Sequence, residues 1–280
     1  MDRIGYGANK DSQYTQFSNL KKIGYDVVGN IAIIKFDRDV SSSEKKKFAL
    51  DYLSKNRSVK TVLEKIGKFS GRLRTLKTKW LSGEKTLEAL YRENGCEFRF
   101  NVETCYFSPR LSEERKNVAS LVKKNERVLV MFGGVAPFAV VIAKNSKASE
   151  VFSVELGREC SKYAVENVRR NKLVNRVHVV QGDVRRVIGA GKKVSGAFDR
   201  IVMTRPNLVD SFLDAAFSVS KRGSVIHYYG FYLEEEKDKI KDLINSEAAK
   251  AGLKVKIMRI VKAGDIGARK FRYRADIKVN

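Results

Sequence analysis

Apolar positions in the first third of the chain predict both strands and a helix. Residues 96–102 alternate between apolar and polar side chains, as a half-buried strand does, the apolar run 27–36 also has the pattern of a strand, and 59–66 is a less secure one. Residues 42–56 have the spacing of a lysine-rich helix that begins after a serine cap. This mixture of strands and a helix predicts a small α+β domain.

Beyond residue 108, short apolar runs alternate regularly with amphipathic helices. Helices are expected at 111–122 and near 137–144, 158–171, 209–220 and 233–251, with strands at 127–132, 150–155, 177–181, 198–203 and 223–229. This alternation predicts an α/β domain with a parallel sheet covered on both faces. The last two strands, 254–261 and 269–279, are joined only by a short loop, so the sheet should end in an antiparallel hairpin.

The pattern therefore divides the chain into three parts. A polar arm is expected at 1–24, the small α+β domain at 25–108 and the α/β domain at 109–280. With 280 residues, 43% of them hydrophobic, the chain is long enough to bury a substantial core.

The composition argues against membrane, metal and disulfide classes. The longest apolar stretch, 128–143, is shorter than a membrane span, and the N-terminus lacks a signal peptide's hydrophobic region. Three cysteines without a CxxC pair and only two histidines argue against a zinc site and against structural disulfides. We therefore expect a cytoplasmic protein without a membrane or metal partner.

The charge of the chain indicates a polyanionic partner. Lysine and arginine number 56 against 32 acidic residues, a formal net charge of +24. A lysine-rich thermophilic surface is the alternative, but it usually adds glutamate as well, so a nucleic acid is favoured.

A basic segment gives this partner a candidate surface. Residues 65–79 contain six basic side chains and no acid, with Phe69 and Trp80 nearby, which suits phosphate contact and base stacking. An edge strand protected by lysines explains the segment equally well. The candidate RNA contacts are the basic residues Arg72, Arg74, Lys77, Lys79, Arg92, Arg110 and Arg205.

A glycine turn follows the first strand of the α/β domain. Gly133 and Gly134 precede a helix that begins near Pro137, so backbone N–H groups can approach a ligand closely. Glu155 ends the next strand, about twenty residues later, where an acid accepts hydrogen bonds from ribose hydroxyls. The turn lacks GxGxxG and its proline removes an N–H group, so a nucleoside without phosphates, such as S-adenosylmethionine, is favoured.

The third strand adds Asp183, which either reaches an adenine amino group or caps the segment 184–188. Other chemistries lack support, because the sequence has no phosphate loop and no GxSxG elbow, and His227 lies in an apolar run as a packed residue. The candidate cofactor contacts are Phe132, Gly133, Gly134, Val135, Pro137, Phe138, Glu155, Leu156, Gly182, Asp183, Val184 and Thr204.

Five sequence motifs resemble one enzyme family. In order and spacing they are similar to the archaeal and eukaryotic tRNA (guanine-N1)-methyltransferases that modify guanosine 37, beside the anticodon. The motifs are Arg92-Glu-Asn-Gly-Cys-Glu-Phe98, Tyr106-Phe-Ser-Pro-Arg-Leu-Ser-Glu-Glu-Arg115, Val130-Met-Phe-Gly-Gly-Val-Ala-Pro-Phe138, Glu166-Asn-Val-Arg-Arg-Asn-Lys-Leu173 and Ile226-His-Tyr-Tyr-Gly-Phe231. The resemblance runs from about Val27 to the C-terminus.

The resemblance implies a class I, Rossmann-like methyltransferase domain that uses S-adenosylmethionine, preceded by an RNA-facing domain. It also implies a tRNA anticodon stem-loop as partner, and we expect a monomer. Arg110 matches an arginine expected near the target base, where it would stabilise charge on the guanine O6. Glu126 falls at a position where members often have an acid, a candidate general base. Otherwise, Arg110 is a helix-entry residue and Glu126 a surface residue of a turn.

The chain departs from the family pattern in two places. Val130 stands where members usually have aspartate, and Thr204-Arg205-Pro206 replaces an Asn-Leu-Pro sequence whose asparagine holds the guanine edge. Thr204 and Pro206 are therefore the corresponding catalytic candidates. A branch with altered residues here also methylates a tricyclic wyosine precursor at the same tRNA position. The alternatives are an aminocarboxypropyl transferase of the wybutosine pathway and a non-catalytic RNA-binding homologue.

Overall fold

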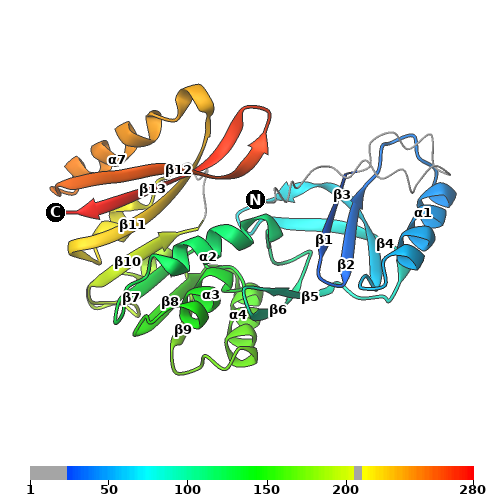
Figure 1. The fold of residues 1–280 in the computed structure, drawn as a ribbon, viewed down its shortest axis with the longest axis horizontal. Coiled ribbons are helices and arrows are strands. Elements are labelled where there is room, and N and C mark those ends of the chain that lie inside the picture. The colour runs from blue at the N-terminus through cyan, green and yellow to red at the C-terminus, as the bar shows by residue number, and fades with distance from the viewer. Residues whose placement is uncertain (1–23, 205–209) are drawn as a thin grey trace, which may run out of the picture. The chain divides into compact units, whose positions relative to one another are not determined.

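The computed structural model describes residues 24–204 and 210–280, which form two compact units (Figure 1). The smaller unit holds the described residues up to Tyr91 together with Asn101–Tyr106, and the larger holds Arg92–Phe100 and Phe107–Asn280. The predicted boundary at 108 differs from this division mainly at residues 92–100. The predicted arm, apart from Gly24, lies outside the described residues.

The smaller unit is a four-stranded sheet with one helix. The strands lie in the order β1 (Gly24–Val28), β2 (Ile31–Lys35), β3 (Thr61–Ser70) and β4 (Thr75–Gly83), and α1 (Ser42–Lys55) connects the parallel pair β2 and β3. A capping box between Ser41 and Glu44 begins α1. The apolar faces of helix and sheet form one core, which includes Ala32, Ile34, Phe48, Val62 and Leu81.

Two further strands, β5 (Glu88–Glu93) and β6 (Cys96–Asn101), form a separate two-stranded sheet that contributes residues to both units. Gly29 in the smaller unit packs against β5, since a Cβ there would lie 1.8 Å from the Leu90 carbonyl oxygen. Only glycine fits this approach.

The larger unit contains the predicted α/β sheet. Its seven strands lie in the order β12-β13-β11-β10-β7-β8-β9. All are parallel except β13, which runs antiparallel to β11 and β12, so the expected terminal hairpin is present. The strands are β7 (Arg127–Met131), β8 (Glu150–Glu155), β9 (Val177–Gln181), β10 (Phe198–Met203), β11 (Ser220–Leu233), β12 (Val255–Gly267) and β13 (Lys270–Val279).

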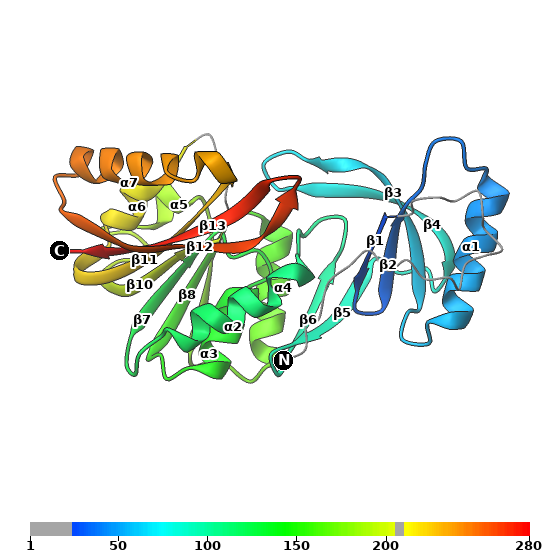
Figure 2. The same ribbon diagram turned by 45° about the horizontal axis from the view of Figure 1, so that its top comes forward.

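Helices cover both faces of this sheet, as Figure 2 shows, with α2, α3 and α4 on one side and α5, α6 and α7 on the other. These are α2 (Ser112–Ser120), α3 (Pro137–Asn145), α4 (Arg158–Arg170), α5 (Val184–Val187), α6 (Leu213–Phe217) and α7 (Lys239–Lys250), with short 3-10 turns η2 (Pro109–Leu111) and η3 (Glu234–Glu236). The helix expected at 209–220 is thus only five residues long, because β11 begins at Ser220. No helix within the described ranges is long and apolar enough to cross a membrane.

Candidate functional site

The carboxyl ends of four parallel strands bring the predicted cofactor residues together. Because β7, β8, β9 and β10 are parallel neighbours, the residues that follow them meet at one edge of the sheet. The chain turns back in opposite directions on either side of β7, which is where open α/β sheets bind ligands. This carboxyl edge carries Gly133, Gly134, Glu155, Gly182, Asp183 and Thr204.

The glycine turn is tightly packed. Phe132, Gly134 and Ala136 have φ values of 61°, 56° and 65°, so the backbone reverses within a few residues before α3 begins at Pro137. A Cβ at Gly133 would lie 2.1 Å from Ser153 Oγ. A side chain at Gly133 would therefore force the buried Ser153 hydroxyl on β8 to move.

Glu155 links two backbone turns at the carboxyl edge. Its Oε2 accepts a hydrogen bond from the Gly134 N–H at 2.8 Å, and its Oε1 accepts one from the Gly157 N–H at 2.6 Å. A carboxylate has about four lone-pair directions, so acceptor capacity remains. The half-buried group is thus held in place while it can still accept hydroxyl donors.

These residues fit the ribose of S-adenosylmethionine. Gly133 has no side chain to cover the backbone of the turn. Beside it, the Glu155 carboxylate, which is held by the Gly134 N–H, supplies a hydrogen-bond acceptor. Three of the predicted contacts, Val135, Phe138 and Val184, are buried in the core.

Asp183 caps a helix. Its carboxylate accepts a hydrogen bond from the Arg185 N–H at 3.0 Å, and it is the N-cap residue of α5. The structure thus shows the capping role that the sequence left as one of two options. Gly182 is required here too, since a Cβ would lie 2.4 Å from Val187 Cγ1.

Thr204 ties the end of β10 to the glycine turn. Its hydroxyl donates toward the carbonyl oxygen of Phe132 at 2.8 Å, with the Met131 carbonyl at 3.2 Å. The hydroxyl proton is therefore used within the protein. Arg205 and Pro206 lie outside the described residues.

A group that the sequence did not indicate is formed by Arg185 and residues 210–214. Arg185 is hydrogen-bonded to Asp214 at 3.1 Å, forms an ion pair with Asp210 and lies over the Phe212 ring at 4.6 Å. Phe212 in turn packs edge-on against Phe132 at 5.2 Å. Since Phe132 opens the glycine turn, this group closes the flank of the carboxyl edge.

Arg110 lies at the same edge of the larger unit. It belongs to η2, directly before α2, and it is exposed. The first turn of α2 lies near the end of β11, where Tyr229 Oη donates to Glu114 at 2.6 Å. Just after the last turn of α2, the Leu121 carbonyl accepts a hydrogen bond from Arg200, near the start of β10. The helix thus runs away from the carboxyl edge, and Arg110 is at its near end.

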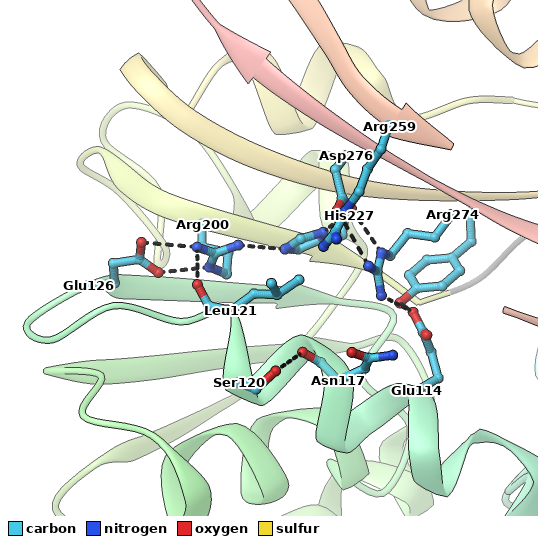
Figure 3. Close-up of polar contacts among 11 residues, drawn as sticks. Glu114, Asn117, Ser120, Leu121, Glu126, Arg200, His227, Arg259, Arg274 and Asp276 are labelled. Carbon is cyan, nitrogen blue, oxygen red and sulfur yellow. Dashed lines mark hydrogen bonds and ion pairs between the residues drawn. The ribbon is translucent and has the colours of Figure 1, made fainter. Parts of the chain in front are cut away.

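Glu126 lies at the opposite edge of the sheet. It directly precedes β7, whereas Gly133 follows that strand, and its carboxylate is paired with Arg200 at 2.7 and 3.0 Å (Figure 3). A five-residue strand separates the two ends by about 15 Å. Glu126 therefore lacks the position that a general base beside the cofactor requires.

The Arg200 pair is the start of a buried polar network (Figure 3). Arg200 donates to His227 Nε2 at 2.7 Å, and His227 Nδ1 donates to Asp276 at 2.5 Å. Asp276 also pairs with Arg259 and Arg274, and Arg274 pairs with Glu114 at 2.5 Å, so the network joins α2 to four strands.

Burial decides the protonation state of this network. It lowers the pKa of His227 to about 4, despite the opposing effect of Asp276. Burial by itself would raise the pKa of Asp276, but the hydrogen bond from His227 and the neighbouring arginines hold that pKa well below its usual range. The interpretation of His227 as a packed residue is confirmed, since the side chain is completely buried.

The basic segment 65–79 forms the β3–β4 hairpin. Lys77 and Lys79 are exposed opposite Ile66 and Glu64, on the face that bears α1, whereas Trp80 lies opposite Leu63 on the other face. The basic side chains and the tryptophan are therefore not on one surface.

A different aromatic group lies in the smaller unit. The Arg74 guanidinium stacks 3.6 Å from the centre of the Tyr106 ring, and Tyr106 packs edge-on against Phe69 at 5.0 Å. The segment also has an edge-strand character, since β4 is the last strand of its sheet and the Glu103 carboxylate accepts from the Thr78 N–H at 2.6 Å.

The cysteines differ from expectation. Cys96 is a buried free thiol, with its pKa raised by burial to about 11, but Cys105 and Cys160 are disulfide-bonded, so the argument against structural disulfides is wrong. In the part of the chain that the structure describes, no group of three or more His, Cys, Asp or Glu side chains is placed to hold a metal ion.

Comparison with known proteins identifies relatives with similar sequences. The family model described as the TRM5/TYW2 methyltransferase domain matches residues 89–258. The chain is 34% identical over 263 residues to tRNA (guanine(37)-N(1))-methyltransferase Trm5b of Pyrococcus abyssi, covering 91% of this chain and 74% of that protein. It is 32% identical over 303 residues to tRNA (guanine(37)-N(1))/4-demethylwyosine(37)-methyltransferase Taw22 of Nanoarchaeum equitans, covering 91% and 99%.

The fold agrees with these relatives. The crystal structure of Trm5b from Pyrococcus abyssi superposes with a TM-score of 0.82 at 31% identity, covering all of this chain and 82% of that one.

Proposed function

The chain belongs to the TRM5/TYW2 methyltransferase family, and on that premise we propose that it transfers the methyl group of S-adenosylmethionine to N1 of guanosine 37 in tRNA. The observation that carries the proposal is the carboxyl edge of the larger unit. There the glycine turn and the anchored Glu155 carboxylate lie at the same edge as Arg110.

In this proposal the cofactor supplies an activated methyl group on a sulfonium. Glu155 accepts hydrogen bonds from the ribose hydroxyls, as its fixed position between Gly134 and Gly157 supports. The residue pairs Phe132–Phe212 and Arg185–Asp214 keep water from the flank of the nucleoside.

Arg110 acts on the target base. With the guanine rotated out of its stack, the guanidinium stabilises the negative charge that grows on O6 as N1 loses its proton. The exposure of Arg110 at the carboxyl edge supports this role. No comparable support exists for Glu126, which is held by Arg200 at the opposite edge.

The proposed partner is the anticodon stem-loop, bound by a monomer. The net charge of +24 and the exposed Lys77 and Lys79 support an RNA partner. The complex of aTrm5 with tRNALeu, whose protein matches this chain with a TM-score of 0.80 at 25% identity, supports tRNA in particular.

A second activity at the same position, methylation of 4-demethylwyosine, is favoured by the similarity to Taw22. Thr204 supports it, because its hydroxyl is bonded to the Phe132 carbonyl and offers no bidentate amide to a guanine edge. A pocket without that contact accepts a larger base more readily.

Labelled S-adenosylmethionine and anticodon stem-loops with guanosine, inosine or adenosine at position 37 test the proposal. We expect label transfer to guanosine and inosine, which share the N1 and O6 groups, and none to adenosine. Mass spectrometry of the nucleoside should show an added methyl group. Addition of the heavier aminocarboxypropyl group, or equal labelling of adenosine, would refute the assignment.

A further inference from the structure

The motif 166–173 contains two asparagines, Asn167 and Asn171, that have no part in the proposed reaction. Asn167 lies on α4 and Asn171, four residues later, is the C-cap of that helix, so both point to the same side of it, and both are buried. That side meets β6, which among the described strands pairs with β5 alone, so that within the described residues its other edge has no strand beside it.

The two side chains take the place of the missing strand. Asn171 accepts from the Glu97 N–H at 2.9 Å and donates to the Glu97 carbonyl at 2.7 Å, while Asn167 accepts from the Arg99 N–H at 2.8 Å and donates to the Arg99 carbonyl at 3.2 Å. Each amide thus completes the backbone hydrogen bonds of one β6 residue. In their hydrogen bonds to β6 the two asparagines are therefore equivalent.

They differ in their remaining N–H donor. Asn171 uses it on the Asn167 carbonyl of its own helix, at 2.8 Å. Asn167 donates instead to the carbonyl of Val135, at 3.1 Å, in the middle of the glycine turn. Asn167 thus connects β6 to the turn at the carboxyl edge.

The turn is therefore held from two sides. Glu155 accepts from the Gly134 N–H, and Asn167 donates to the carbonyl one residue further on, between the left-handed residues Gly134 and Ala136. Loss of the Asn167 bond would allow Val135 to rotate and shift the Gly134 N–H away from Glu155.

We propose that Asn167 is a positioning residue for the cofactor turn, whereas Asn171 serves only to hold β6. The proposal rests on the function proposed above, since it assumes that the turn binds S-adenosylmethionine. It predicts that the two asparagines, alike in sequence motif, burial and contact with β6, differ in their effect on cofactor affinity.

The test compares Asn167→Asp with Asn171→Asp. Each substitution replaces the side-chain NH₂ group by a carboxylate oxygen of similar size. This oxygen would face the two backbone carbonyl groups to which the NH₂ group donates. We expect Asn167→Asp to raise the calorimetric Kd for S-adenosylmethionine about tenfold, and Asn171→Asp to change it less than about twofold. Equal effects of the two substitutions, or no effect of Asn167→Asp, would overturn the proposal.

Hydrogen exchange gives a readout without cofactor. Amides in the turn 133–138 should exchange faster in Asn167→Asp than in Asn171→Asp, at matched global stability. Asn167→Ala and Asn171→Ala, which remove the side-chain donor without a buried charge, repeat the comparison if the aspartate variants do not fold. If the unaltered chain binds no S-adenosylmethionine, the proposed function fails, and the exchange rates still decide the role of Asn167.

Discussion

At the scale of single residues, the carboxyl edge depends on a carboxylate that is fixed by backbone donors. Replacing Glu155 with glutamine keeps an acceptor for one of the N–H groups of Gly134 and Gly157 and puts an NH₂ group against the other. We expect the Kd for S-adenosylmethionine to rise at least about tenfold in calorimetry. Glu150→Gln, at the other end of β8, is the control and should leave the Kd unchanged.

Arg110 should affect the reaction and not the cofactor. Arg110→Ala removes the cation expected at the guanine O6, so kcat for the stem-loop should fall by about a hundredfold while the Kd for S-adenosylmethionine stays the same. Single-turnover methylation and calorimetry measure the two quantities. Arg222→Ala, which removes an exposed arginine at the start of β11, should change neither. Loss of cofactor affinity in Arg110→Ala would contradict the role.

Sequence reasoning located some of these residues and misplaced others. Gly133 and Glu155 were predictable, because a residue that follows a parallel strand must lie at the carboxyl edge. Glu126 was misassigned because it precedes its strand, so the direction of β7 places it at the other edge. The contact of Asn167 with Val135 joins residues far apart in the chain, which no local pattern reveals.

At the scale of elements, the strands of the larger unit were predictable, since four of the five parallel runs match to within one residue. The buried network that joins them was not. Arg200, His227 and Asp276 come from three strands, and only the strand order makes them neighbours. The length of α6 was also overestimated, because Phe212, with a φ of 57°, directly precedes the helix and β11 already begins at Ser220.

This network makes the fold sensitive to mild acid. His227 takes up a proton near pH 6.5 in the unfolded chain, whereas burial keeps its pKa near 4 in the folded state. Between these values the unfolded state binds more protons, so stability falls as the pH decreases. We expect the free energy of unfolding to drop by about 2 kcal/mol from pH 7 to pH 5 on this account.

Denaturant unfolding at both pH values measures the effect. The drop should be smaller in His227→Gln, whatever that substitution does to stability at pH 7. His178→Gln, at a half-exposed position near Glu150, should retain the drop. An unchanged drop in His227→Gln would show that other groups cause it.

The β3–β4 hairpin offers a test of RNA contact. Changing Lys77 and Lys79 to glutamate should raise the Kd for tRNA at least about tenfold and reduce its salt dependence, because two cations near phosphate are lost. The same change at Lys46 and Lys47, exposed on α1, alters the net charge equally. Equal effects of the two pairs in fluorescence anisotropy would favour the edge-strand interpretation.

At the scale of the whole molecule, the excess of 24 positive charges should separate the two ligands by their response to salt. Counterion release makes the logarithm of the tRNA affinity fall linearly with the logarithm of the salt concentration. Binding of S-adenosylmethionine, by a carboxylate and backbone groups, should change little over the same range. A tRNA affinity that is insensitive to salt would exclude phosphate contacts as its main source.

Trp80 is the only tryptophan in the 280 residues, and it is 40% exposed on β4, with the Lys85 ammonium 5.4 Å from its ring centre. The tryptophan emission of the unlabelled enzyme, excited selectively over its tyrosines, therefore originates in the four-stranded unit. Quenching in a stopped-flow experiment would time the arrival of a nucleobase or phosphate at this sheet, without a dye and independently of turnover.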